Sequence, residues 1–375
     1  MHFRKFGNTG IKVSALGFGA MRLPTIGEDE EKRVDLDQSV PILQKGLDLG
    51  INYIDSAWAY LNGTSEVAVG EAIAGRDRSS IYIATKNPID TDLKEWRKRL
   101  DIQLERLKTD YIDFYHMHSL QGRVFKKKVV PEGYLKALQQ ARDEGLIRHI
   151  SFSCHDSPRN IFKLIDTGEF SSMLVQYNLL HRYNDAAIAY AKKKGLGVAI
   201  MGPVGGGRIN FMAHLQPREG RTIPELALRF VLANQNIDVA LSGMQSLDMV
   251  EENAATADNV GPLSALEQED IQAMLEQLKG LEDLYCTGCD YCMPCPEGVN
   301  IPNNFMLYNY ERLYTFGDNI AEAYHKGLKP AGASAESCIE CGECVEKCPQ
   351  NIPIPERLRE VAEEFAKKQG EDSSS

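Results

Sequence analysis

Apolar and polar positions follow two different periods along the first two thirds of the chain. Short apolar runs are typical of buried β-strands, and they alternate with longer stretches whose apolar residues recur every three or four positions, as in amphipathic helices. The pattern predicts strands at residues 15–21, 52–56, 81–85, 111–117, 147–152, 173–177, 197–201 and 239–242. It predicts intervening helices at residues 36–50, 65–75, 93–108, 132–144, 185–194 and 224–234.

Strands that alternate with helices predict an α/β fold with a parallel sheet, and this number of units in one domain predicts a closed (β/α)8 TIM barrel. An open, doubly wound sheet is the alternative. It is less favoured because no Gly-x-Gly-x-x-Gly run follows an early strand. Asn8-Thr9-Gly10 lies between apolar residues and predicts a hairpin over residues 3–13 that closes the lower end of the barrel.

The alternation stops after Pro262. A predicted helix at residues 265–281 leads into a segment that holds eight of the nine cysteines, and the stretches 305–314, 320–326 and 355–368 are also predicted to be helical. We therefore expect a barrel domain over residues 1–265, a small, mainly helical domain over 266–370, and a disordered tail over 371–375.

Polar side chains capable of carbonyl chemistry follow successive predicted strands. Asp55 ends the second strand, Tyr60 lies in the loop behind it, Lys86 ends the third strand and His118 the fourth. Tyr60 would be a general acid, and a neighbouring lysine would stabilise its tyrosinate. Asp55 would hold that lysine, and His118 would orient the substrate oxygen. A single Asp is often only a helix cap and a single Tyr often only packs, so the combination carries the hypothesis.

Several short motifs surround these residues: Phe6–Gly10, Val13–Gly19, Ile54–Tyr60, Ala84–Lys86 and Tyr111–His118. Through them, residues 3–260 resemble the aldo-keto reductase family. The resemblance implies an enzyme that transfers hydride between NAD(P)H and a carbonyl or alcohol substrate. His116 occupies the same strand, but the family motif favours His118 as the catalytic histidine.

The same resemblance implies the positions that bind the nicotinamide cofactor. The family usually has a Ser-Asn pair at the nicotinamide amide, and this sequence has cysteine in place of the asparagine, although a thiol is a poor donor to an amide. The implied cofactor residues are Ser153, Cys154, Gln176, Met201, Gly202, Pro203, Gly205, Gly206, Gly243, Met244, Gln245, Glu252 and Asn253.

The cofactor preference depends on charge after the last strand. NADPH-preferring relatives bind the 2′-phosphate there with Lys and Arg, whereas the corresponding positions here are Gly243 and Met249. No Lys or Arg occurs between Arg229 and Lys279. We therefore expect NADH, unless Arg208 or another distant residue reaches the phosphate.

The clustered cysteines form two runs that each end in Cys-Pro. Residues 286–296 have the pattern C-x2-C-x2-C-x2-C-P, and residues 338–349 have C-x2-C-x2-C-x3-C-P. The second is the bacterial ferredoxin run, and the segment resembles helical ferredoxin-type modules with two [4Fe–4S] clusters. Zinc sites are the alternative, but they usually have two separated Cys-x-x-Cys pairs. The resemblance implies one cluster on Cys286, Cys289, Cys292 and Cys348, and another on Cys338, Cys341, Cys344 and Cys295.

Composition limits the partners and the location. The net charge is −11 and Lys126–Lys128 is the longest basic run, which argues against binding nucleic acid. No apolar run is long enough to cross a bilayer, and no signal peptide is evident. We therefore expect a cytoplasmic enzyme with a small-molecule substrate and no membrane contact.

The role of the clusters remains open. They could exchange electrons with a redox protein or the substrate, or they could be structural or sense oxygen. A third alternative is an electron-transfer protein on an inactive barrel, against which the intact set of four catalytic residues argues. Hydride carries two electrons whereas each cluster accepts one, and no flavin motif is evident to mediate between them.

Overall fold

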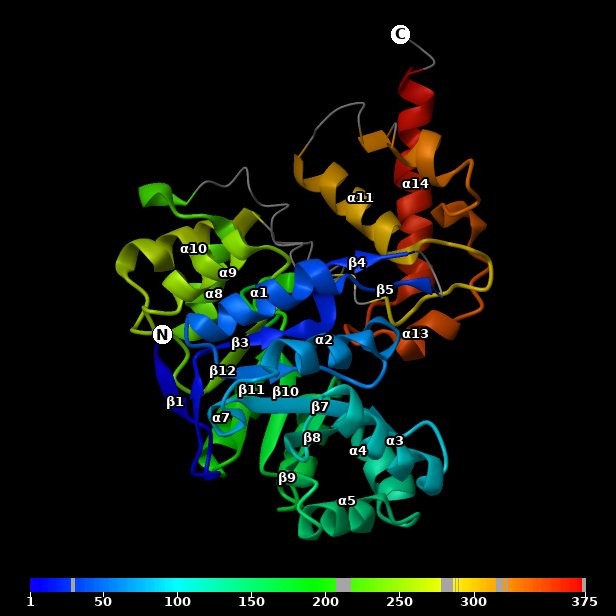
Figure 1. The fold of residues 1–375 in the computed structure, drawn as a ribbon. Coiled ribbons are helices and arrows are strands. Elements are labelled where there is room, and N and C mark those ends of the chain that lie inside the picture. Colours follow the sequence, from blue (N-terminus) through cyan, green and yellow to red (C-terminus); the bar gives the residue numbers. More distant parts are fainter. Residues whose placement is uncertain are drawn as a thin grey trace. The chain divides into compact units, whose positions relative to one another are not determined.

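In this computed structural model, the structure describes residues 1–27, 31–206, 217–277, 286, 288, 290–314, 320–321 and 323–372. The chain divides into two compact units. The first unit contains Met1–Val204 and Pro224–Gln268, and the second contains Gly205–Ile223 and Glu269–Ser375. Figure 1 shows the helices and strands of each.

The first unit is a closed barrel of parallel strands in the order β10-β11-β12-β3-β6-β7-β8-β9. Every strand pairs with its neighbours in the sequence, and β12 closes the barrel on β3 through the pair Leu241–Gly17. The fold predicted from the sequence is therefore confirmed. The strands are β3 (Leu16–Gly19), β6 (Tyr53–Asp55), β7 (Tyr82–Pro88), β8 (Ile112–His118), β9 (Ile147–Cys154), β10 (Ser172–Gln176), β11 (Gly197–Met201) and β12 (Val239–Ser242).

The predicted hairpin is formed by β1 (Phe3–Lys5) and β2 (Lys12–Ser14). Phe6 directly follows β1, and its ring makes an edge-to-face contact with that of Phe114, with the centroids 4.8 Å apart. Gly7 has φ +51°, and a Cβ there would lie 2.3 Å from the backbone nitrogen of Gly197, so only glycine fits. Phe6 belongs to a buried apolar cluster contributed by several barrel strands, including Phe114, Leu174 and Val239.

Helices connect the strands, and several begin with a capping side chain. Asp35 accepts a hydrogen bond from the backbone of Gln38, and Asp92 accepts one from that of Glu95. Three helices, α4, α6 and α9, are additional to those the periodicity predicts. The helices are α1 (Leu36–Asp48), α2 (Thr64–Ile73), α3 (Leu93–Arg106), α4 (Gly122–Val124), α5 (Tyr134–Asp143), α6 (Pro158–Ile165), α7 (Asp185–Lys193), α8 (Ile223–Leu232), α9 (Leu247–Thr256) and α10 (Ala265–Gln277).

The second unit is mainly helical, with α11 (Ile301–Tyr314), a π-helix at Ala323–Leu328, α13 (Glu343–Lys347) and α14 (Ile354–Asp372). The ring of Tyr324 stacks on Phe365, with centroids 4.1 Å apart, inside a separate buried apolar cluster. Helix α14 extends to Asp372, within the segment predicted as a tail. Ser373–Ser375 lie outside the described residues. None of the described helices has the length and apolar character that crossing a membrane requires.

Candidate active site and cysteine sites

Lys86 and Asp55 form a buried ion pair between neighbouring strands. Lys86 Nζ donates to Asp55 Oδ1 at 2.5 Å and to the carbonyl oxygen of Ser56 at 2.6 Å. Lys86 is 1% exposed and Asp55 is 4% exposed. Burial raises the pKa of Asp55, and the charge of Lys86 opposes that rise. The arrangement fixes an ammonium group at the carboxyl end of the barrel strands.

Tyr60 lies beside this ammonium group, at the start of a short 3-10 segment, Tyr60–Gly63. Lys86 Nζ is 4.6 Å from the centroid of the Tyr60 ring. Leu61 and Asn62 adopt left-handed conformations, with φ of 51° and 56°, and turn the chain directly after the tyrosine. Asn62 Nδ2 secures this turn by donating to the carbonyl oxygen of Lys32 at 2.9 Å. The turn therefore sets where the Tyr60 ring lies.

His118, the last residue of β8, completes the group. Its ring centroid is 6.0 Å from that of Tyr60, in an edge-to-face arrangement. Burial, reinforced by the charge of Lys86, holds the pKa of His118 well below its usual range. Burial likewise lowers the pKa of His116, which pairs with Lys86 in the sheet register, to about 3. Both histidines are therefore neutral at physiological pH, and His118 is the one beside Tyr60.

Two residues implied for the nicotinamide lie at the ends of β10 and β11. Gly202 has φ +67°, and a Cβ there would lie 2.6 Å from Gln176 Nε2. Gln176 Nε2 is buried and makes no hydrogen bond within the described residues. Asn178 Nδ2 donates to the carbonyl oxygen of Gly202 at 2.8 Å, which holds the backbone at Gly202 in place. A buried amide without a partner beside a glycine is suited to a ligand with hydrogen-bonding groups, so these residues fit a nicotinamide cofactor.

Ser153 and Cys154 end β9, and both side chains already have backbone partners. Ser153 Oγ accepts from the backbone nitrogen of Ser119 at 2.9 Å, which leaves its own hydroxyl proton to donate. Cys154 Sγ accepts from the backbone nitrogen of Asp156 at 3.3 Å. Burial raises the pKa of Cys154 to about 12, so the thiol is neutral. Ser153 is therefore the better placed of the two to contact a ligand.

The segment implied for the adenosine end follows β12 into α9. Met244 is fully buried in the core, so its side chain faces away from solvent. Asn253 Nδ2 donates to Ser242 Oγ at 3.1 Å, and the side chains of Gln245 and Glu252 are exposed. Met201 is the last residue of β11, and Pro203, Gly205 and Gly206 lie at the described start of the loop that follows. Arg208 lies outside the described residues.

In the second unit, several cysteines line one cavity although they are distant in sequence. Cys295 from the first run lines it with Cys338, Cys341 and Cys344 from the second run, and Cys292 also contributes. Burial and the neighbouring thiols raise the pKa of Cys344 to about 11. Among the described residues, no three Cys, His, Asp or Glu side chains are placed to hold one metal ion. A set of thiols spread around a cavity fits an iron–sulfur cluster, which divides its ligands among several irons.

The two cysteine runs share a backbone conformation at equivalent positions. Two residues after the first cysteine, Gly288 and Glu340 have φ of 60° and 58°. Four residues after it, Asp290 and Gly342 have φ of 61° and 79°. The described positions of the two runs therefore match in their positive φ, and Cys289 itself lies outside the described residues.

Comparison with known proteins shows the family of the barrel. The sequence pattern of the Aldo/keto reductase family matches residues 15–218, which is more than half of the chain. L-galactose dehydrogenase of Arabidopsis thaliana is 31% identical over 318 residues, covering 75% of this chain and 96% of that protein. The chain belongs to the aldo/keto reductase family. It is an NAD(P)H-dependent oxidoreductase of that type.

Other relatives of this aldo/keto reductase support the same assignment. The NADH-specific methylglyoxal reductase of Escherichia coli is 26% identical, covering 74% of this chain and 98% of that protein. The holo structure of the aldo-keto reductase AKR11C1 from Bacillus halodurans has a TM-score of 0.62 and 28% identity, covering 73% of this chain and 96% of that one. Residues 285–352 match a 4Fe-4S dicluster domain. The enzyme therefore combines a reductase barrel with an iron–sulfur domain.

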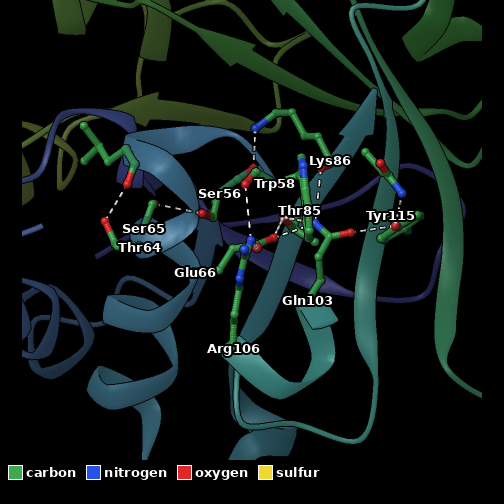
Figure 2. Close-up of polar contacts among 12 residues, drawn as sticks. Ser56, Trp58, Thr64, Ser65, Glu66, Thr85, Lys86, Gln103, Arg106 and Tyr115 are labelled. Carbon is green, nitrogen blue, oxygen red and sulfur yellow. Dashed lines mark hydrogen bonds and ion pairs between the residues drawn. The ribbon is translucent and has the colours of Figure 1, made fainter. Parts of the chain in front are cut away.

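The structure of this aldo/keto reductase also reveals residues that the sequence interpretation missed. A Cβ on Gly243 would lie 3.3 Å from Arg22 Cβ, so Arg22 lies against the loop after the last strand. Because a closed barrel places the loops after its first and last strands side by side, the predicted fold contained this signal. A second group, built around the buried Glu66, lies behind β7 (Figure 2).

Proposed function

We propose that the barrel reduces a small carbonyl compound by hydride transfer from NADH, or oxidises the corresponding alcohol. The observation that carries the proposal is the Lys86 ammonium group, which contacts Asp55 and lies beside the Tyr60 ring. The nicotinamide would supply the hydride. Tyr60 would donate a proton to the nascent alkoxide, and Lys86 would stabilise the tyrosinate that remains. Neutral His118 would hydrogen-bond the substrate oxygen and orient it.

Backbone and side-chain positions at the ends of the later strands would hold the cofactor. Ser153 and Gln176 would bind the amide of the nicotinamide, and the glycines of the loop that begins at Gly202 would allow the backbone to approach the pyrophosphate. Of Ser153 and Cys154, Cys154 is the weaker candidate, because a thiol is a poor donor to an amide and its sulfur already accepts a backbone hydrogen bond. The segment from Gly243 to Asn253 would hold the adenosine end.

A preference for NADH is supported by charge. No Lys or Arg lies between Arg229 and Lys279 in the sequence, and Lys45, which reaches this segment from α1, is already paired with Glu251 at 2.6 Å. The Escherichia coli relative described as NADH-specific points the same way. Arg22 is the residue best placed to alter this preference, because it lies against Gly243.

The second unit would bind two [4Fe–4S] clusters. One would be held by Cys295, Cys338, Cys341 and Cys344, and the shared cavity supports this set. The other would be held by Cys286, Cys289, Cys292 and Cys348, and the matching backbone conformations of the two runs support its equivalence to the first. The clusters would supply one-electron chemistry.

Electron exchange with a redox protein is a further part of the proposal, and the exposed side chain of Cys341 supports it. The test is optical and anaerobic. Added NADH should bleach the cluster absorbance without an added flavin if the two units are coupled. A mediated reductant poised at the potential of NADH that bleaches the clusters while NADH itself does not would argue for structural or oxygen-sensing clusters.

The reductase proposal is tested with Tyr60→Phe. This change removes the proposed acid and leaves the cysteines untouched. Carbonyl reduction should fall about 10²–10⁴-fold, the usual contribution of general acid catalysis. Iron content and NADH binding should match those of the wild type. Full activity in this variant would remove the basis of the proposal.

A further inference from the structure

A buried group of polar side chains lies behind β7, where the strand packs against α2 and α3. Residues in a strand alternate between its two faces, so Thr85 points to this side whereas Lys86 points into the barrel. We refer to the group as the Glu66 network (Figure 2). Its members are Glu66, Thr85, Gln103, Arg106 and Tyr115. None of them has a role in the chemistry described above.

Glu66, from α2, is the centre of the network and is 0% exposed. Its Oε1 accepts from Thr85 Oγ1 and from Gln103 Nε2, each at 2.5 Å. Its Oε2 accepts from an Arg106 guanidinium nitrogen at 3.2 Å. Burial raises the pKa of Glu66, and these donors oppose that rise. Burying a carboxylate costs free energy of folding, and apolar residues of similar volume often replace buried charges without loss of stability. Stability alone therefore does not account for a buried glutamate at this position.

Gln103 connects Glu66 to the backbone of Lys86. Gln103 Nε2 also donates to the carbonyl oxygen of Lys86 at 3.2 Å, and Gln103 Oε1 accepts from the hydroxyl of Tyr115 at 2.6 Å. The amide is therefore held at both ends. The same carbonyl oxygen of Lys86 accepts from the backbone nitrogen of Trp58 at 2.9 Å. Gln103 thus joins the end of β7 to the loop that carries Tyr60.

Arg106 connects Glu66 to the loop that carries Tyr60. An Arg106 guanidinium nitrogen donates to the carbonyl oxygen of Trp58 at 3.3 Å, and the guanidinium carbon lies 4.3 Å from the centroid of the indole ring. On the other side of Tyr60, Gly63 has φ +80°, and a Cβ there would lie 2.5 Å from Arg106. Arg106 therefore packs against the chain both before and after Tyr60.

We propose that Glu66 is a positioning residue that fixes Lys86 and Tyr60 relative to one another, acting through Gln103 and Arg106. This inference rests on the proposed function. One carboxylate orients both donors, so the backbone of Lys86 and the Tyr60 loop share a single anchor. The distance between the ammonium group and the phenol ring depends on both segments, and a misplacement of about 1 Å can reduce a rate by 10²-fold.

The test is Glu66→Gln, which keeps the shape of the side chain and removes the charge. We expect kcat for an activated aromatic aldehyde to fall roughly 10–100-fold, with little change in KM or in the Kd for NADH. The basic limb of the kcat–pH profile should move upward by about one pH unit, because a displaced ammonium group stabilises the tyrosinate less. If Glu66 served stability alone, the basic limb of the kcat–pH profile would not move.

Asp238→Asn is the matched control. Asp238 is 1% exposed and accepts from the backbone nitrogen of Val198 at 3.0 Å, without contact to the Glu66 network. This variant should have a lower Tm and an unchanged pH profile. The same outcome for Glu66→Gln, with a lower Tm only, would overturn the inference.

Gln103→Met provides a second test that does not require Glu66→Gln to fold. It keeps the side-chain length and removes the hydrogen bonds to Glu66 and to the Lys86 carbonyl oxygen. We expect the same upward movement of the pH profile, and an unmoved profile would count against the proposal. In the double variant Glu66→Gln/Gln103→Met, the pH profile should move no further than in the single variant with the larger shift. Both changes interrupt the same chain of hydrogen bonds, so their effects should not add.

A readout without turnover separates this inference from the proposed function. The ultraviolet absorbance of tyrosinate is titrated with pH, and subtraction of the matching Tyr60→Phe variant isolates Tyr60. The midpoint should be higher in Glu66→Gln than in the wild type. Equal midpoints would refute the positioning role, whereas absent carbonyl reduction by the wild type would refute the proposed function alone.

Discussion

Lys86 Nζ lies 4.6 Å from the centre of the Tyr60 ring while donating a 2.5 Å hydrogen bond to Asp55. The ammonium group therefore has two roles, since it neutralises a buried carboxylate and lies beside the proposed proton donor. These roles can be separated experimentally.

Lys86→Met should reduce both activity and stability. Removing one partner of a buried ion pair costs about 3–5 kcal/mol because the other charge remains buried. The unpaired Asp55 would then have a further raised pKa, so the folded state would bind a proton that the unfolded state releases, and stability should fall as pH rises above about 4. Thermal denaturation at several pH values measures this.

The double variant Lys86→Met/Asp55→Asn is the control for that prediction. Without either charge, the pH dependence should disappear and much of the Tm should return. Carbonyl reduction should stay low, because the cation beside Tyr60 is still absent. Recovery of activity together with stability would show that Lys86 is needed only for folding.

The low pKa of His118 predicts the acidic side of the kcat–pH profile. Burial and Lys86 keep this imidazole neutral, so no loss of activity from its protonation is expected near pH 6.5, the usual pKa of histidine. Activity should therefore stay level as the pH falls through 6.5, apart from the titration of other groups. An acidic limb near pH 6.5 that disappears in His118→Gln would contradict the neutral assignment.

Metal analysis should find about eight irons and eight acid-labile sulfides per chain after anaerobic purification. Cys154→Ser should retain all of the iron because this buried thiol lies in β9, in the barrel. Cys341→Ala should lose iron from the site that it shares with Cys295. Stoichiometric zinc with negligible iron would refute the cluster proposal.

Cofactor titration should show that NADPH does not bind more tightly than NADH. Each charge-assisted contact to a phosphate contributes about 1.5–3 kcal/mol, and the segment after β12 supplies no such contact from its own sequence. Arg22→Ala measures whether the arginine beside Gly243 replaces them, and we expect similar weakening for both cofactors. A tenfold lower Kd for NADPH than for NADH would contradict the preference.

Gly202→Ala should weaken NADH binding. The added Cβ would meet the amide of Gln176 at 2.6 Å and displace it from the proposed nicotinamide site. Gly145→Ala is the matched control, because Gly145 also has a positive φ of 81° but a Cβ there meets nothing within 4 Å. Both variants should lose about 1 kcal/mol of stability, and only Gly202→Ala should raise the Kd for NADH. The same Kd for NADH in Gly202→Ala and Gly145→Ala would mean that the nicotinamide does not bind beside Gly202.

The barrel could be predicted because the two hydrophobic periods are distinct and the strands are short. The proximity of Asp55, Lys86 and His118 followed from the same pattern, since parallel strands bring their carboxyl ends to one side. Helix α6 was missed although Ile161, Leu164 and Ile165 are buried along it; it has only eight residues, and α9 is marked mainly by its Ser246 cap.

The Glu66 network was not predictable in the same way. Glu66 and Gln103 resemble ordinary helix-surface residues when each helix is considered alone. Their burial depends on how α2 and α3 pack over β7, which is a tertiary contact between segments more than thirty positions apart. Arg22 differs, because closure of the barrel through β3 and β12 already implied that it lies near Gly243.

The cavity that joins Cys295 to the second cysteine run has a topological consequence. Cys295 and Cys338 are 43 positions apart, and α11 and the π-helix lie between them. A cluster bound there closes this stretch into a loop, as a covalent cross-link would. For a loop of that length, the chain-entropy estimate for a cross-link is about 4 kcal/mol of stabilisation. Oxidative loss of such a cluster would therefore release the helices between the two cysteines.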